Sequence, residues 1–271
     1  MNPESIPMNF IEIFSRVGWI GIALPEDLGG SGLGISEATM MLQIISDSTT
    51  RHLRNATVVN LAPETLKLRT QATRDGDRYT ISGQKINKPS EGLSPFFIDF
   101  DKSKQGLEPK HTSKMEGRAV DANEVFFDNY SIPGDSLIGN EDQGFKIVLH
   151  GMTAARCLLA GETLGLSYAA LYRTSTHAKD RHPLADGYML LEAAKLATYH
   201  AARLYDQPTT NVSVTQAAAF SARERSMLSL GGNGTCEGVS SGECFVPRIA
   251  PVSRQMVKNY FADKVLKLPM I

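Results

Sequence analysis

The sequence predicts a mainly helical α+β protein, with a β domain placed between a helical N-terminal part and a C-terminal helix bundle. Apolar residues repeat at helical spacing near the start of the chain, alternate with polar residues in the middle, and give way to Leu- and Ala-rich stretches from about residue 143. A repeat near 3.6 residues indicates an amphipathic helix, and a repeat of two indicates a strand. Because the two element types are separated along the chain, we expect three domains, at residues 1–64, 65–140 and 141–271.

The N-terminal part is expected to contain two helices joined by a turn. The first helix has apolar residues at i, i+3, i+4 and i+7, namely Phe10, Ile13, Phe14 and Val17. Residues 24–34 contain Pro25 and four glycines, which favour a loop. Ser36 is expected to cap the second helix, whose core-facing residues are predicted to be Met40, Met41, Ile44 and Ile45.

The middle region has the alternating pattern of β-strands. Apolar or small residues alternate with polar ones over residues 66–72, and the alternation resumes at Tyr79 and Ile81. Asp75 and Gly76 are expected to form the hairpin turn between these two strands. Two further short strands are predicted at residues 95–100 and 124–127, which are rich in aromatic and β-branched side chains.

Four helices are predicted for the C-terminal bundle, at residues 145–179, 184–205, 213–230 and 251–266. The second of them carries small and apolar residues along one stripe, namely Leu190, Ala194, Ala197, Ala201 and Leu204. Alanine-rich faces let helices approach one another closely, which suits a bundle. The third helix is expected to end at the glycine-rich residues 231–234.

Composition excludes several classes of protein. The chain has 28 Lys and Arg against 29 Asp and Glu, and this net charge of −1 argues against a nucleic-acid-binding protein. No run of residues approaches the ~18 apolar residues of a membrane span, and no secretory signal is visible. The three cysteines, Cys157, Cys236 and Cys244, cannot all pair and form no zinc pattern. We therefore expect a reducing, intracellular compartment such as the cytoplasm or an organelle matrix.

Generic catalytic motifs are sparse in this sequence. It has no phosphate-binding loop, no GxGxxG after a strand and no HExxH. The six histidines show no ligand spacing on one helix face, so no metal site is expected. The glycines at 231, 232 and 234 have two interpretations: a simple helix end, or a backbone that approaches a phosphate or nucleotide closely because glycine has no side chain.

Four ordered segments resemble the acyl-CoA dehydrogenase family. Residues 23–32 (ALPEDLGGSG) resemble its N-terminal signature, and residues 72–86 (ATRDGDRYTISGQKI) resemble part of its middle β domain. Residues 121–133 (DANEVFFDNYSIP) resemble the exit from a strand of that domain, and residues 228–234 (LSLGGNG) resemble the family's glycine turn. Members of the family have a helical domain, a β domain and a four-helix bundle in this order, in agreement with the pattern described above.

The resemblance implies a flavoprotein that oxidises acyl-CoA thioesters. In this family FAD accepts a hydride from the substrate while a carboxylate base removes the α-proton, a role that burial of a glutamate supports. Arg156 matches an arginine of the substrate-side helix, and its alternative role is a surface charge. Gly231, Gly232 and Gly234 match the turn that contacts FAD across a subunit interface, so the resemblance implies an FAD-binding homo-oligomer.

Both positions at which the family places its base lack a carboxylate. The segment that matches the usual glutamate begins with Pro251, and the second known position, directly before Arg156, is Ala155. Glu162 lies on nearly the same helix face as Ala155, but about 10.5 Å further along the helix axis. Glu162 is therefore the candidate base, and its alternative role is a polar residue of the bundle.

Segments that contact the flavin ring in the family are reduced as well. The family's TEPxxGSD stretch corresponds to residues 61–64 (LAPE), and residues 87–90 (NKPS) replace the tryptophan and hydroxyl residue that follow the GxK strand. The family has an FGxxI loop between the first two bundle helices. This loop is missing here, and residues 180–183 (DRHP) run directly into the second helix. Three interpretations stay open: a dehydrogenase with a displaced base, an inactive relative that binds a ligand or partner, and a deleted or altered version of an ordinary enzyme.

Overall fold

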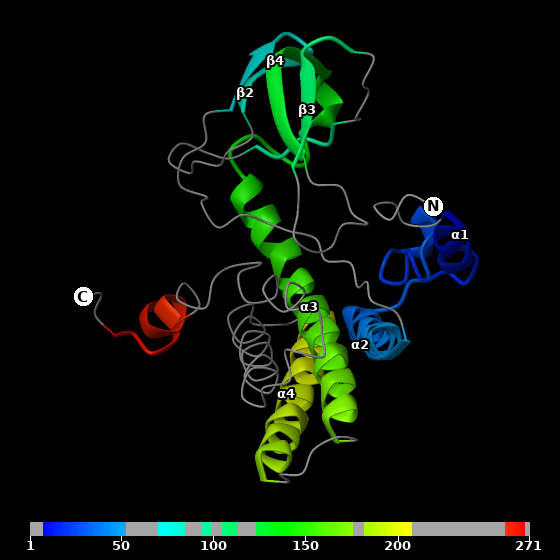
Figure 1. The fold of residues 1–271 in the computed structure, drawn as a ribbon. Coiled ribbons are helices and arrows are strands. Elements are labelled where there is room, and N and C mark those ends of the chain that lie inside the picture. The colour runs from blue at the N-terminus through cyan, green and yellow to red at the C-terminus, as the bar shows by residue number, and fades with distance from the viewer. Residues whose placement is uncertain are drawn as a thin grey trace. The chain divides into compact units, whose positions relative to one another are not determined.

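The computed structural model describes residues 8–52, 70–84, 94–98, 104–112, 123–175, 182–207 and 258–268. These residues fall into two compact units. One is a β unit, made of the described residues between 70 and 112 and of residues 123–151. The other is a helical unit, made of residues 8–52, 152–175, 182–207 and 258–268. The described part of the chain is thus mainly helical with one small sheet, as the sequence predicts (Figure 1). The three-domain division at residues 64 and 140 stays a prediction.

The β unit is built on a four-stranded antiparallel sheet. In chain order its strands are β1 (Gln71–Asp75), β2 (Arg78–Gln84), β3 (Leu107–His111) and β4 (Asn123–Pro133), and their order in the sheet is β1-β2-β4-β3. The predicted hairpin is confirmed, but its turn lies one residue later than predicted: Asp75 pairs with Arg78, so the turn residues are Gly76, which has a φ of 59°, and Asp77. Such a left-handed backbone favours glycine.

The core of the β unit lies on one face of this sheet. Tyr79 pairs with Ile132 and Ile81 pairs with Tyr130 across β2 and β4, and all four side chains are buried. The predicted alternation therefore identifies Tyr79 and Ile81 correctly as residues of the buried face of the sheet. Further along, the register shifts and β4 has one extra residue near Asn129, which adopts a φ of 49°. Asn tolerates this conformation better than most residues, and such a bulge increases the twist of the strand.

One predicted strand needs correction, and one observed strand was not predicted. Residues 94–98 form no regular strand and contribute a single bridge between Phe96 and Leu137. The sequence pattern does not predict strand β3, because Pro109 cannot donate a ladder hydrogen bond and argues against a strand. The structure places β3 at the edge of the sheet, where a proline is tolerated. The strand predicted at residues 124–127 is confirmed as part of the longer β4.

The helical unit contains α1 (Met8–Arg16), the short 3-10 helix η1 (Glu26–Leu28), α2 (Ile35–His52), most of α3 (Gly144–Ser175) and α4 (His182–Asp206). Helices α3 and α4 confirm the first two predicted bundle helices to within a few residues. Residues 258–260 are helical and continue into the π-helical turn η4 (Phe261–Val265), which lies within the predicted helix 251–266. The helix predicted at residues 213–230 lies outside the described residues.

Close packing between α2 and α3 determines which face of α2 is buried. A Cβ added to Gly161 would lie 2.5 Å from the Thr39 carbonyl oxygen, and one added to Gly165 would lie 2.3 Å from the Gln43 carbonyl oxygen. The two backbones therefore meet almost directly, and α2 buries its small residues Thr39 and Ser46.

The predicted inward face of α2 is accordingly wrong in part. Met40 and Ile44 are 50% and 59% exposed, because α2 turns its small polar residues toward α3 instead. On α1 and just after it, Ile13 and Val17 are exposed as well, at 57% and 53%. Hydrophobic periodicity predicts the helices correctly but not which neighbour each face meets.

Candidate functional site

Both described site candidates, Arg156 and Glu162, are buried side chains of α3. Their exposed fractions are only 4% and 6%. Six residues along an α-helix correspond to a rotation of about 600° and a rise of about 9 Å, so the two side chains leave the helix about 120° apart. The remaining candidates, Gly231, Gly232 and Gly234, lie outside the described residues.

The part of α3 around Glu162 is tightly packed. Gly161 and Gly165, on either side of it, lie against the backbone of α2. The hydroxyl of Thr163 donates to the carbonyl oxygen of Leu159 at 2.7 Å, and the hydroxyl of Ser167 donates to that of Thr163 at 2.7 Å. These contacts satisfy two buried hydroxyl groups within the helix itself. Glu162 is thus a buried acid in a closed segment of the helical unit, and its role as a base stays a prediction.

The position directly before Arg156 lacks an acid–base group. Ala155 is half-buried on α3 and has only a methyl group. On the other side of Arg156, the Cys157 thiol is fully buried against Ala201 and Ala202 of α4. Burial, with a further contribution from Asp206, raises the pKa of Cys157 to about 12, although the nearby Arg156 lowers it. Since the thiolate is the nucleophilic form, Cys157 is a packing residue rather than a nucleophile.

A carboxylate at the end of α4 caps the beginning of α2. Asp206 accepts hydrogen bonds from the backbone N–H groups of Ile35 and Ser36, at 2.8 and 2.9 Å, and from the Ser36 hydroxyl at 2.6 Å. The Glu37 side chain reaches back to the backbone N–H of Gly34 at 2.9 Å. The prediction that Ser36 caps α2 is therefore corrected: Ser36 belongs to the first turn, and the capping carboxylate comes from residue 206. A negative charge at this place also suits the helix dipole.

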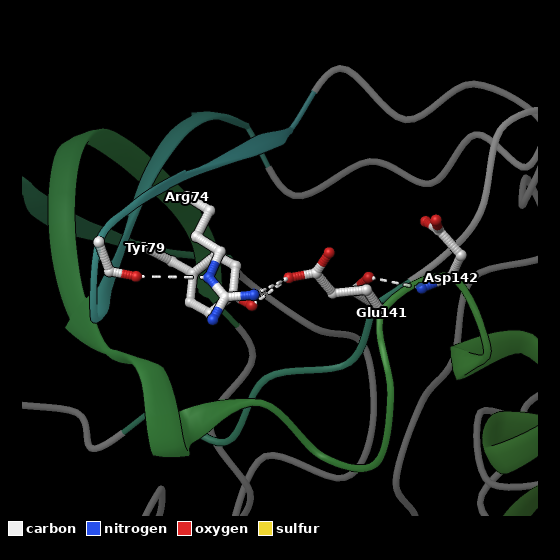
Figure 2. A network of polar contacts seen from close by, with 6 residues as sticks. Arg74, Tyr79, Glu141 and Asp142 are labelled. Atoms are coloured by element: carbon white, nitrogen blue, oxygen red, sulfur yellow. Dashed lines mark hydrogen bonds and ion pairs between the residues drawn. The ribbon is translucent and has the colours of Figure 1, made fainter.

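A polar network in the β unit has no signal in the sequence pattern and becomes visible only in the structure (Figure 2). Glu141 accepts hydrogen bonds from the Tyr79 hydroxyl and from Arg74 Nη1, the latter at 3.3 Å. The bond to Glu141, followed by burial, raises the pKa of the Tyr79 phenol. The next residue, Asp142, donates its backbone N–H to the Ser94 hydroxyl at 3.0 Å. The network holds the segment that precedes α3, and because Arg74 and Glu141 are exposed, their ion pair contributes at most about 1 kcal/mol.

Two general features of the described part of the chain bear on function. Among residues whose positions the structure gives, no three His, Cys, Asp or Glu side chains lie together as metal ligands would. Among the described helices, none has the length and apolar composition of a membrane span.

Comparison with known proteins extends over nearly the whole chain. No family model matches it. The acyl-CoA dehydrogenase FadE12 of Mycobacterium tuberculosis (strain ATCC 25618 / H37Rv) is 26% identical over 336 aligned positions, which cover 94% of this chain and 87% of that protein. Cyclohex-1-ene-1-carbonyl-CoA dehydrogenase of Syntrophus aciditrophicus is 24% identical over 275 positions, covering 75% of this chain and 66% of that protein.

Solved structures show the same relationship at the level of the fold. The butyryl-CoA dehydrogenase of Megasphaera elsdenii matches with a TM-score of 0.76 and 17% identity, over 94% of this chain and 89% of that one. The chain therefore has the acyl-CoA dehydrogenase fold. Its alignment with FadE12 has 336 positions, more than the 271 residues of this chain, so FadE12 contains internal segments that are absent here. The chain is similar to acyl-CoA dehydrogenases and lacks internal segments that FadE12 contains.

Proposed function

We propose that this protein is a flavin-dependent dehydrogenase that introduces an α,β double bond into an acyl-CoA thioester. The observation that carries the proposal is the similarity to acyl-CoA dehydrogenases along 94% of the chain, joined with their fold. The order of helical, β and helical segments supports the same function.

The chemistry requires a hydride acceptor and a base. FAD, when bound, supplies the hydride acceptor, and the glycines that the resemblance assigns to it are Gly231, Gly232 and Gly234. The described residues do not fit the base half of the reaction, because Ala155 has no carboxylate and Glu162 is only 6% exposed. Removal of a general base typically lowers a rate by ~10²–10⁴-fold. We therefore propose a slow enzyme whose Arg156 lies on the substrate side.

An absorbance spectrum of the purified protein tests this proposal. Bound FAD gives visible flavin bands, and an anaerobic addition of a straight-chain acyl-CoA bleaches them if the substrate is oxidised. Slow bleaching supports the proposal. A colourless protein that also fails to take up added FAD contradicts it and favours an inactive relative or an altered version. Rapid bleaching shows instead that a base is present, and Glu162 is then the first residue to replace.

The protein is also proposed to self-associate in a reducing, intracellular compartment. The family resemblance supports a homo-oligomer, and α4 exposes large apolar side chains such as Met189 and Leu196, which are 68% and 73% exposed. The buried, protonated thiol of Cys157 suits a compartment without disulfides. Light scattering at micromolar concentration tests the first point, and a monomer contradicts it. Labelling of the thiols of the native protein inside cells tests the second, and an intramolecular disulfide contradicts it.

A further inference from the structure

An exposed apolar surface lies in the first described segment of the helical unit. Six large apolar side chains within residues 13–28 are between 43% and 71% exposed: Ile13, Val17, Trp19, Ile20, Leu24 and Leu28. We call these six residues the apolar surface. Single exposed apolar residues are ordinary, but six within sixteen residues give this segment the composition of a surface that binds another chain.

The loop that carries much of the apolar surface is held in one conformation. The backbone N–H of Leu28 donates to the Pro25 carbonyl oxygen at 3.1 Å, and the Ser31 hydroxyl donates to the Gly18 carbonyl oxygen at 3.0 Å. Gly30 packs so closely that an added Cβ would lie 2.1 Å from the Leu24 carbonyl oxygen. A preorganised loop loses little conformational entropy on binding, which favours a docking role.

The charges around the apolar surface indicate the sign of its partner. Residues 12–28 contain three carboxylates, Glu12, Glu26 and Asp27, against one cation, Arg16. All four of these side chains are exposed. Potentials across an interface are usually complementary, so the partner is expected to be apolar and cationic.

The chain itself contains a segment of this chemistry. Residues 258–268, which we call the cationic segment, contain three lysines and one aspartate. Lys258 and Lys267 are exposed, and so are Leu266 and Leu268, at 64% and 52%. Its apolar and cationic side chains match the apolar and anionic side chains of the first surface. We infer that the cationic segment of one copy docks on the apolar surface of a second copy of this chain.

Charge reversal in two separate variants tests this contact. The variant K258E/K267E makes the segment anionic, and the variant E26K/D27K makes the loop cationic; all four side chains are exposed, so the fold is expected to survive. Each variant alone opposes like charges, and we expect its self-association at low ionic strength to be at least about tenfold weaker than that of the wild type. Because each variant carries the complement of the other, an equimolar mixture should recover the wild-type mass in light scattering.

A control variant distinguishes this contact from a general effect of added negative charge. The variant K104E/K110E reverses two exposed lysines of the β unit and should leave the mass unchanged. Three results would overturn the inference: a monomeric wild type, single variants that associate as strongly as the wild type, or a mixture that stays dissociated. A chain that carries all four substitutions, E26K/D27K/K258E/K267E, has complementary charges within itself. If this chain recovers the wild-type mass while the mixture of the two double variants does not, the contact lies within one chain and the inference is wrong. The inference rests on the proposed self-association: a monomeric wild type overturns both, whereas a wild type that associates no more strongly than the single variants overturns the inference alone.

Discussion

At the scale of single residues, burial determines what the polar groups of α3 do. Arg156, Cys157 and Glu162 all lie on this helix and are all more than nine-tenths buried. The sequence shows their spacing, but their exposure depends on α2 and α4, which pack against the helix. Cys157 illustrates this point: burial keeps its thiol protonated, and the protonated thiol is unreactive.

The Cys157 thiol should be nearly unreactive in the folded protein. In a variant with Cys236 and Cys244 replaced by Ser, Cys157 is the single thiol. Because its pKa is raised to about 12, we expect Ellman's reagent at pH 8 to modify it at least about 10³-fold more slowly than in denaturant. The same pKa shift makes the free energy of unfolding depend on pH. The unfolded thiol ionises near its ordinary pKa while the folded thiol stays protonated, so the stability of the fold falls as the pH rises above about 9. Rapid modification of the native protein would contradict this assignment.

At the scale of secondary-structure elements, two contacts position α2. Glycines 161 and 165 let α3 approach its backbone, and Asp206 of α4 caps its first turn. Both contacts join residues that are more than 100 positions apart in the chain. Each gives a prediction with a matched control.

Alanine at Gly165 should destabilise the helical unit. The new Cβ would lie 2.3 Å from the Gln43 carbonyl oxygen and 2.7 Å from the Asp47 backbone nitrogen, and backbone atoms cannot rotate away. We expect the free energy of unfolding in urea to fall by about 1–3 kcal/mol. Gly151 of α3 is the control, since an added Cβ meets nothing within 4 Å. Its replacement by Ala should raise stability by about 0.5–1 kcal/mol through helix propensity. Equal effects of the two substitutions would show that α2 and α3 do not pack in this way.

Removal of the Asp206 carboxylate should weaken the start of α2. Asp206→Ala eliminates the acceptor for two backbone N–H groups and one hydroxyl group, and we expect a loss of about 1–2 kcal/mol. Ser36→Ala removes one of these three bonds and leaves the backbone cap in place, so it should have a smaller effect. The comparison is made by thermal unfolding at neutral pH. If Ser36→Ala is the more damaging of the two, the capping group is the serine that the sequence pattern favours.

At the scale of the whole molecule, the fold is retained although internal segments of its relatives are missing. The chain still covers 89% of a solved butyryl-CoA dehydrogenase with a TM-score of 0.76. The helices and the sheet that form the buried cores are therefore present. Activity is the property that depends most on the residues that are absent or replaced.

Two substitutions separate the possible sources of the base. Glu162→Gln keeps the volume of the side chain and removes its ability to accept a proton. Because Glu162 is only 6% exposed and lies about 10.5 Å along the helix axis from Ala155, we expect this change to leave the rate of flavin bleaching by acyl-CoA unaltered. Ala155→Glu restores a carboxylate at a position where the family resemblance places a base, and we expect it to raise the rate by ~10²–10⁴-fold. A large loss of rate in Glu162→Gln, measured on protein with the same flavin content, would identify Glu162 as the base.

Sequence patterns alone predict the segregated order of helix, sheet and helix, the hairpin between β1 and β2, and the buried pair Tyr79 and Ile81. These features depend on local periodicity and turn chemistry, which neighbouring residues contain in full. The sequence also contained the four motifs of the family resemblance. Three other features follow from the packing of the folded chain: Met40 and Ile44 are exposed, Pro109 lies in an edge strand and Asp206 caps α2. Each of these three features depends on a contact with a segment that is distant in the sequence. Residue type and spacing do not predict which distant segment will be the neighbour.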